Sequence, residues 1–102
     1  MVEEVLLTKG LTLVRRLRLE SGETTRWHVD PYHRVSVVLQ GSALEIEYRD
    51  GSEPQHVTTT PGQVDWDEPT DRPHRARNVG STYEEVVIFF RDREDAHQQP
   101  DA

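Results

Sequence analysis

The chain has 102 residues, the size of one ordinary domain, and hydrophobic residues make up only 33% of it. With 19 acidic and 12 basic side chains its formal net charge is −7, which disfavours nucleic acids and anionic membrane surfaces as partners. Cysteine is absent, which excludes disulfides, thiolate metal sites and cysteine nucleophiles.

The first ten residues do not resemble a secretory signal. Glu3 and Glu4 stand where such a signal carries positive charge, and no apolar run reaches the length that spans a membrane. We therefore expect a cytoplasmic protein.

Residues alternate between apolar and polar along most of the chain, and no segment shows a helical stripe of three turns. In residues 11–20, for example, Leu13 and Leu17 share one parity while Arg16 and Arg18 share the other. The same alternation runs through residues 43–50, "ALEIEYRD". This pattern predicts an all-β fold whose strands have one solvated face.

Residues 35–40 and 84–91 do not alternate between apolar and polar, because β-branched and aromatic side chains occupy both parities. Such strands are covered on both faces, and we expect one of these faces to be a subunit contact in a homodimer. Turn signals at short intervals separate seven to nine strands and predict a small antiparallel β-barrel or jelly roll. Residues 93–102 are polar and without periodicity, so we expect a disordered tail there.

Residues 26–35, "RWHVDPYHRV", combine several metal-ligating side chains. His28 and Asp30 are two apart and therefore share one face of an extended strand. Pro31 marks a bend, after which His33 points either into the same cavity or to the other face. His74, which follows a proline in the distant stretch "RPHRARN", is a further candidate ligand.

The spacing of these residues resembles the two motifs of the cupin superfamily. The first motif is matched by Gly22, five residues, His28-Val29-Asp30, three residues, Arg34, six residues and Gly41. The second is matched by Gly62, six residues, Pro69-Thr70-Asp71, two residues, His74, three residues and Asn78. Asp30 stands where the usual cupin has its second histidine, and Arg34 stands where it has a glutamate.

The resemblance implies a single cupin domain over residues 1–92, with a divalent Fe, Mn, Zn or Ni ion inside the barrel. The expected ligands are His28, Asp30, His33 and His74 if His33 turns inward. If it does not, the set is His28, Asp30 and His74, the two-histidine, one-carboxylate arrangement of non-heme iron sites. Arg34 opposes a metal unless a carboxylate pairs with it, and a site that holds no metal is the alternative.

The resemblance also implies a class of function. We expect a small-molecule enzyme that uses its metal in dioxygenase-like or isomerase-like chemistry, with Arg34 holding an anionic group of the substrate. Tyr48 and Trp66 are candidates to line the substrate pocket. One alternative is a metal-free cupin that binds a small anionic ligand without catalysis, and a weaker one is an accessory protein with a vestigial cavity.

Overall fold

The computed structural model describes residues 1–92, and the regular elements in that range are all β-strands. Nine strands follow one another along the chain: β1 (Val2–Lys9), β2 (Thr12–Leu19), β3 (His28–Asp30), β4 (His33–Gln40), β5 (Ala43–Tyr48), β6 (Gln55–Thr58), β7 (Val64–Asp67), β8 (Thr70–Asn78) and β9 (Tyr83–Phe90). The prediction of a disordered tail falls on residues 93–102, outside the described range. Within residues 1–92, no helix is long and apolar enough to cross a membrane.

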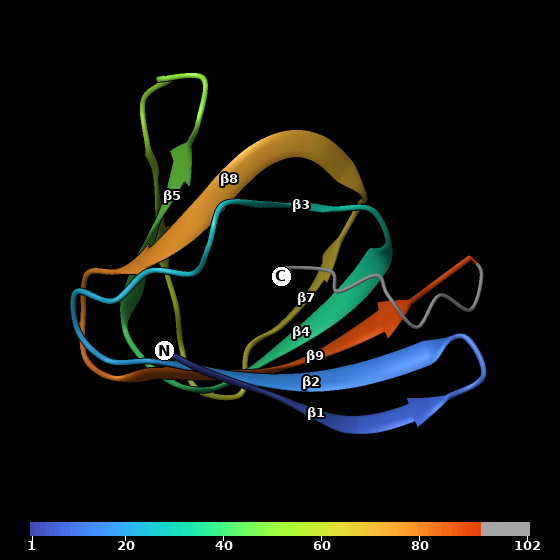
Figure 1. Cartoon of the computed structure of the whole chain (residues 1–102). Helices are drawn as coiled ribbons and strands as arrows, with labels where there is room; N and C mark the ends of the chain where they lie inside the picture. Colours follow the sequence, from blue (N-terminus) through green and yellow to red (C-terminus); the bar gives the residue numbers. More distant parts are fainter. Residues whose placement is uncertain (93–102) are drawn as a thin grey trace.

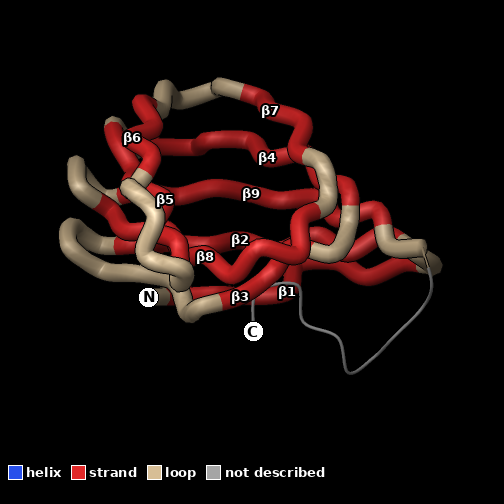
Figure 2. Tube along the Cα trace, turned by 90° about the horizontal axis from the view of Figure 1, so that it is seen from above, coloured by secondary structure: helices blue, strands red, loops and turns tan. Residues whose placement is uncertain are grey.

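The strands form two antiparallel sheets that face each other (Figures 1 and 2). One sheet has the order β1-β2-β9-β4-β7 and the other has the order β3-β8-β5-β6. Neighbours in these sheets are mostly distant in sequence, as the connections of a jelly roll require. The all-β prediction and the jelly-roll architecture are confirmed, although hydrogen bonds do not close the two sheets into a continuous barrel.

The apolar core lies between the sheets and follows the predicted alternation. In β2, Leu13, Leu17 and Leu19 are buried, and in β9, Val87 and Phe89 are buried. The outward residues of the same strands alternate with them, because successive side chains of a strand point to opposite faces. The inner face of the five-stranded sheet therefore forms one wall of the molecule's interior.

Asn78 joins three parts of the chain at one end of the interior. Its side chain is fully buried at the end of β8. Its Nδ2 atom donates to the carbonyl oxygens of Leu19, at 2.9 Å, and Ser81, at 2.8 Å, and its Oδ1 atom accepts from the Gly80 amide at 2.9 Å. The asparagine of the second motif thus satisfies backbone groups that would otherwise be buried without partners.

Replacing Asn78 with alanine should lower the free energy of unfolding by about 3 kcal/mol, because buried backbone groups lose their partners. Gln63→Ala is the matched control, since the Gln63 amide also makes two hydrogen bonds but is only partly buried. It should cost about 1 kcal/mol or less. Urea unfolding measures both values, and equal losses would contradict the structural role of Asn78.

Candidate functional site

A cavity of about 590 Å³ lies between the two sheets. This volume falls in the range of pockets that hold small organic molecules. Its wall combines apolar side chains with ionisable ones from both sheets. The ionisable residues include Arg15, His28, Asp30, Arg34, His74 and Glu85.

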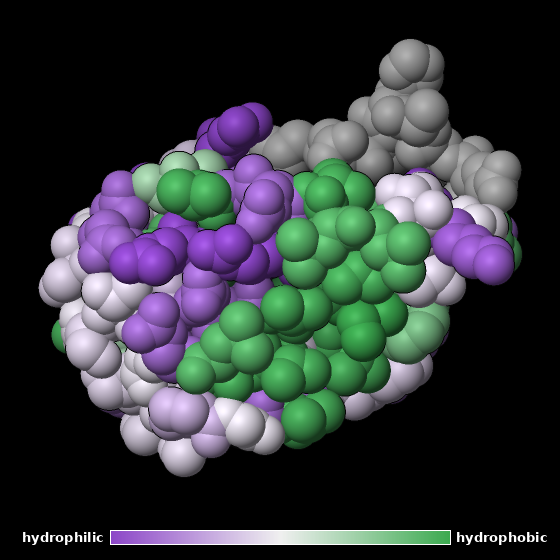
Figure 3. Space-filling model, turned by 90° about the horizontal axis from the view of Figure 1, so that it is seen from below, coloured by the Kyte–Doolittle hydropathy of each residue, from purple (hydrophilic) through white to green (hydrophobic). Residues whose placement is uncertain are grey.

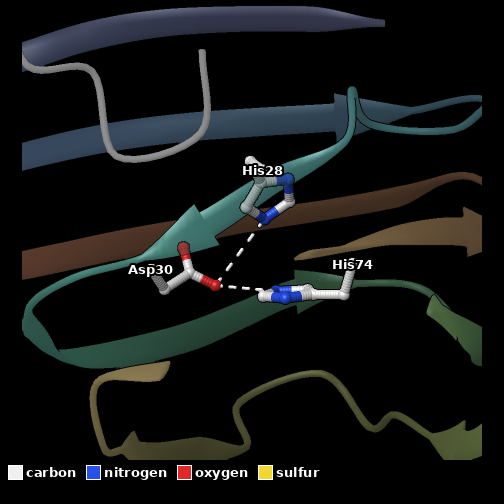
Figure 4. A group of neighbouring side chains, drawn as sticks. All are labelled: His28, Asp30 and His74. Atoms are coloured by element: carbon white, nitrogen blue, oxygen red, sulfur yellow. Dashed lines mark hydrogen bonds and ion pairs between the residues drawn. The ribbon is translucent and has the colours of Figure 1, made fainter. Parts of the chain in front are cut away.

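Three of these residues converge at one place in the cavity (Figure 4). His28 and Asp30 lie on β3, and His74 lies on β8 directly opposite His28. The pairing of β3 with β8 is irregular between His28 and Asp30, where two residues of β3 span four residues of β8. One ligand atom from each residue lies within 4.8 Å of the other two. The exposed fractions of the side chains are 10% for His28, 6% for Asp30 and 12% for His74.

Backbone carbonyl groups orient both histidines. The Nδ1 atom of His28 donates to the carbonyl oxygen of Arg26, and that of His74 donates to the carbonyl oxygen of Arg72, each at 2.7 Å. In each case the acceptor lies two residues earlier in the chain. Both Nε2 atoms are therefore turned toward the group in Figure 4. The hydrogen bond from His74 Nε2 to Asp30 needs a second proton on this ring, which a metal ion would displace.

Three cationic or protonatable groups surround one oxygen of Asp30. Its Oδ2 atom lies 2.8 Å from His74 Nε2, 3.6 Å from His28 Nε2 and 3.4 Å from Arg34 Nη2. Burial alone would raise the pKa of Asp30, but these partners outweigh it and hold the pKa well below its usual range. The Asp30 hydrogen bond raises the pKa of His74, despite burial. Asp30 is therefore a carboxylate at neutral pH.

The donor set fits a divalent metal. Metal–ligand distances near 2.1 Å allow two ligand atoms on one ion to lie at most about 4.2 Å apart, so small side-chain rotations bring these three atoms onto a common ion. Two imidazole nitrogens and one carboxylate oxygen suit Fe(II), Mn(II), Zn(II) or Ni(II). Three protein ligands also leave coordination positions for water or substrate.

Arg34 lies beside this group on β4. Its Nη2 atom contacts Asp30 and lies 3.9 Å from Asp67 on β7, so two carboxylates partly neutralise the guanidinium. The condition under which Arg34 would tolerate a metal, a carboxylate paired with it, is therefore met. Because Arg34 and an incoming metal would share the same oxygen of Asp30, the two cations compete for it.

The structure does not bring His33 to the other three residues. His33 begins β4 and precedes Arg34, so the two side chains point to opposite faces of the sheet. The His33 side chain is 50% exposed, and its Nδ1 atom lies 2.7 Å from Glu68 Oε2. The proline bend does not turn it inward, which leaves the group of His28, Asp30 and His74.

The two aromatic candidates border the cavity differently. Tyr48 lies on the inner face of β5, with the guanidinium of Arg72 3.6 Å from its ring centroid. Trp66 on β7 borders the cavity but is 56% exposed, and its ring stacks on Phe90 at 5.7 Å. A substrate-binding role for either residue stays a prediction.

Arg15, Tyr83 and Glu85 were not among the residues predicted for the site, yet all three line the cavity. Strand parity is the signal that could have found Arg15. Arg15 has the parity of Leu13 and Leu17, and residues 83, 85, 87 and 89 share the inner face of β9.

No protein-family model and no curated protein matches this chain, but solved structures do. A cupin domain from Bordetella pertussis Tohama I has a TM-score of 0.77 and 21% identity, covering 88% of this chain and 92% of its own. An RmlC-like cupin with a double-stranded β-helix fold, from Methanocaldococcus jannaschii, has a TM-score of 0.70 and 16% identity, with coverages of 88% and 79%. The DMSP lyase DddQ from Ruegeria pomeroyi has a TM-score of 0.66 and 18% identity, with coverages of 99% and 53%.

At these identities the likeness concerns the fold. Several of the similar structures are named as cupins or as double-stranded β-helix proteins. They agree with the two motifs that the sequence shares with that superfamily and with the two facing sheets. The chain therefore has the cupin fold, as its histidine motifs predicted.

Proposed function

We propose that the protein binds a divalent metal ion at His28, Asp30 and His74 and acts on a small organic substrate in the adjoining cavity. The observation that carries this proposal is the fixed orientation of both imidazoles, whose Nδ1 atoms bond to backbone carbonyls while their Nε2 atoms approach one carboxylate. One protein that shares the fold, DddQ, is named as a DMSP lyase, which supports an enzyme of this kind. A cytoplasmic location stays a prediction from the sequence.

The residues around the group suit a small substrate that carries a negative charge or several oxygen atoms. Among the residues that the structure describes, the buried Nη1 atom of Arg34 has no hydrogen-bond partner, so it can donate to a bound anion. Tyr48 supplies an aromatic surface on the opposite sheet. A bound metal would supply Lewis-acid chemistry, while Arg34 and the cavity walls orient the substrate and exclude water.

Metal binding is tested by replacing His28 and His74 with alanine together. Wild-type protein should bind about one ion per chain of Fe(II), Mn(II), Ni(II) or Zn(II), and the affinity should fall at least about 100-fold in the double variant, because two of three ligands are lost. Calorimetric titration and elemental analysis of untagged protein measure this. His56→Ala is the control, since His56 is exposed on β6 and should leave metal binding unchanged.

A metal-free ligand-binding protein is the second candidate function. It is favoured by the ion pair between Arg34 and Asp30, because a guanidinium can take the place of a metal as the counter-charge of the buried carboxylate. The cavity would then bind a small anion through Arg34 and the two histidines. Wild-type protein that takes up none of the four metals would favour this candidate.

The competition between Arg34 and the metal gives a further prediction. Arg34→Gln should raise the metal affinity on the order of tenfold, because a positive charge 3.4 Å from the Asp30 ligand oxygen is removed. Arg72→Gln is the matched control, since Arg72 borders the same cavity but pairs with the exposed Asp50. Calorimetric titration with Zn²⁺ compares the three proteins, and equal affinity in Arg34→Gln would contradict the competition.

We also propose that the protein is a homodimer, formed through the outer surface of the five-stranded sheet. Strand register aligns apolar side chains across the whole width of this sheet, in the row Leu7, Val14, Ile88, Val35 and Trp66. A second aligned row contains Val86, Val37 and Val64. Together these rows form the outer apolar face, which Figure 3 shows as a continuous hydrophobic area.

A second copy of the chain is the occupant that suits the outer apolar face. Contiguous apolar surface of this kind marks an interaction site rather than a solvated face. The second row continues into Arg16 and Glu4, and Glu84 also pairs with Arg16, so cations and anions lie side by side at the border. Under a two-fold axis such a mixed border is complementary to its own copy.

The dimer is tested with Leu7→Glu and Val64→Glu. Both side chains are more than half exposed, so the changes should disturb the outer apolar face and not the core. Wild-type protein should have twice the chain mass of 11.8 kDa by light scattering, and both variants should be monomers. Val79→Glu, in an exposed turn after β8, should remain a dimer. A monomeric wild type would contradict the proposal.

A further inference from the structure

Glu85 is an acidic residue in an unusual place, on the inner face of the five-stranded sheet. It lies on β9, with Leu17 of β2 and Val38 of β4 as its partners on either side, and both partners are buried. Its carboxyl group is enclosed between the sheets and lines the cavity. An acidic side chain at such a position is costly unless it is hydrogen-bonded or protonated.

Tyr83 provides the hydrogen bond. Its hydroxyl donates to Glu85 Oε1 at 2.6 Å, and the Tyr83 side chain is 3% exposed. Burial and nearby acidic groups, first among them Glu85, raise the pKa of Tyr83, so the phenol keeps its proton and acts as the donor. The other carboxyl oxygen of Glu85 takes no part in this bond.

The charged groups that face Glu85 come from three strands. Burial raises the pKa of Glu85, while the Tyr83 hydrogen bond and the charges of Arg15 on β2 and Arg34 on β4 oppose this increase. The charge of Asp30 on β3 adds to it. The net effect is an increase, so this carboxyl group keeps a proton at a higher pH than an exposed glutamate does.

Glu85 and the proposed metal group line one cavity from opposite sheets. Glu85 belongs to the five-stranded sheet, whereas His28, Asp30 and His74 belong to strands β3 and β8 of the other. A small molecule between the sheets can therefore meet the metal group on one side and the Glu85 carboxyl on the other. Enzymes place acid–base residues in this relation to the group that binds the substrate.

We propose that Glu85 is the acid–base residue of the cavity, which exchanges a proton with a small carbonyl or hydroxy compound held at His28, Asp30 and His74. When it donates, the O–H bond of its carboxyl group breaks as the proton bonds to a substrate carbon or oxygen, and the carboxylate remains beside the Tyr83 hydroxyl. Taking a proton from another substrate carbon restores the acid. This cycle is an isomerisation and needs no oxidant. The inference rests on the proposed function, and it favours isomerisation over oxygenation.

The test is a pH titration of the glutamate carboxyl groups by carbon NMR, on full-length protein labelled with ¹³C at the glutamate side-chain carboxyl. In wild type, one carboxyl signal should titrate at a higher pH than all other glutamates. That signal should be missing in Glu85→Gln and present in Glu84→Gln, the matched control, because Glu84 is the preceding residue and pairs with Arg16 on the outer face. Tyr83→Phe should move the titration to still higher pH, since it removes a bond that stabilises the carboxylate.

Addition of Zn²⁺ to the same samples tests the position of Glu85 relative to the metal group. A bound cation in the shared cavity should move the Glu85 titration to lower pH. Zn²⁺ affinity should be the same in wild type and Glu85→Gln, within about twofold, at a pH where Glu85 keeps its proton in both the free and the Zn²⁺-bound protein. An ordinary titration for every glutamate, no response to Tyr83→Phe, or no response to bound Zn²⁺ would overturn the inference. Failure of wild type to bind Zn²⁺ with the Glu85 titration still raised would instead overturn the proposed metal site.

Discussion

The buried carboxylate of Asp30 is the constraint on which the rest of the site depends. A carboxylate at 5% residue exposure must have cationic or hydrogen-bonding partners, because burial without them costs several kcal/mol. The chain provides three such partners around one oxygen, from β3, β8 and β4. Ion pairs of Asp30 therefore join the two sheets at this point. A divalent ion bound there would replace the positive charge that these partners of Asp30 now provide.

The fixed direction of side chains along each strand explains why the interior contains charged residues. Each strand of the five-stranded sheet has a fixed inner parity, and that parity contains Arg15, Arg34 and Glu85 together with leucine, valine and phenylalanine. The cation of Arg15 lies 5.1 Å from the ring centroid of Phe89, so part of its burial is compensated by an aromatic contact. A chain with 33% hydrophobic residues thus has a cavity lined in part by charged side chains between its two sheets.

Much of the fold follows from the sequence because a strand's alternation has a simple physical cause. Period 2 in residues 12–19 and 43–48 corresponds to the inner and outer faces of β2 and β5. His28, Asp30 and His74 were predictable as candidates, since the parity of 28 and 30 and the spacing of the second motif both indicate one cavity. Leu11, expected in the same strand as Leu13, instead lies before β2 and is 47% exposed, because the turn after β1 includes it.

The direction of His33 and the partners of Arg34 could not be predicted, because both depend on where β4 begins after Pro31. One residue of difference in that boundary would exchange the faces of His33 and Arg34. Glu85 lies in a segment that is apolar on both parities, so its burial follows from the pairing of β9 with β2 and β4, which only the tertiary structure shows. Long-range pairing, rather than local pattern, decides these positions.

The proposed metal site requires that Asp30, His28 and His74 bind one cation together. Anomalous X-ray diffraction from crystals grown with Mn²⁺ tests this. We expect one strong anomalous peak bonded to the Nε2 atoms of both histidines and to a carboxylate oxygen of Asp30, with Arg34 moved toward Asp67. No peak at this group, with Arg34 still bound to Asp30, would contradict the claim.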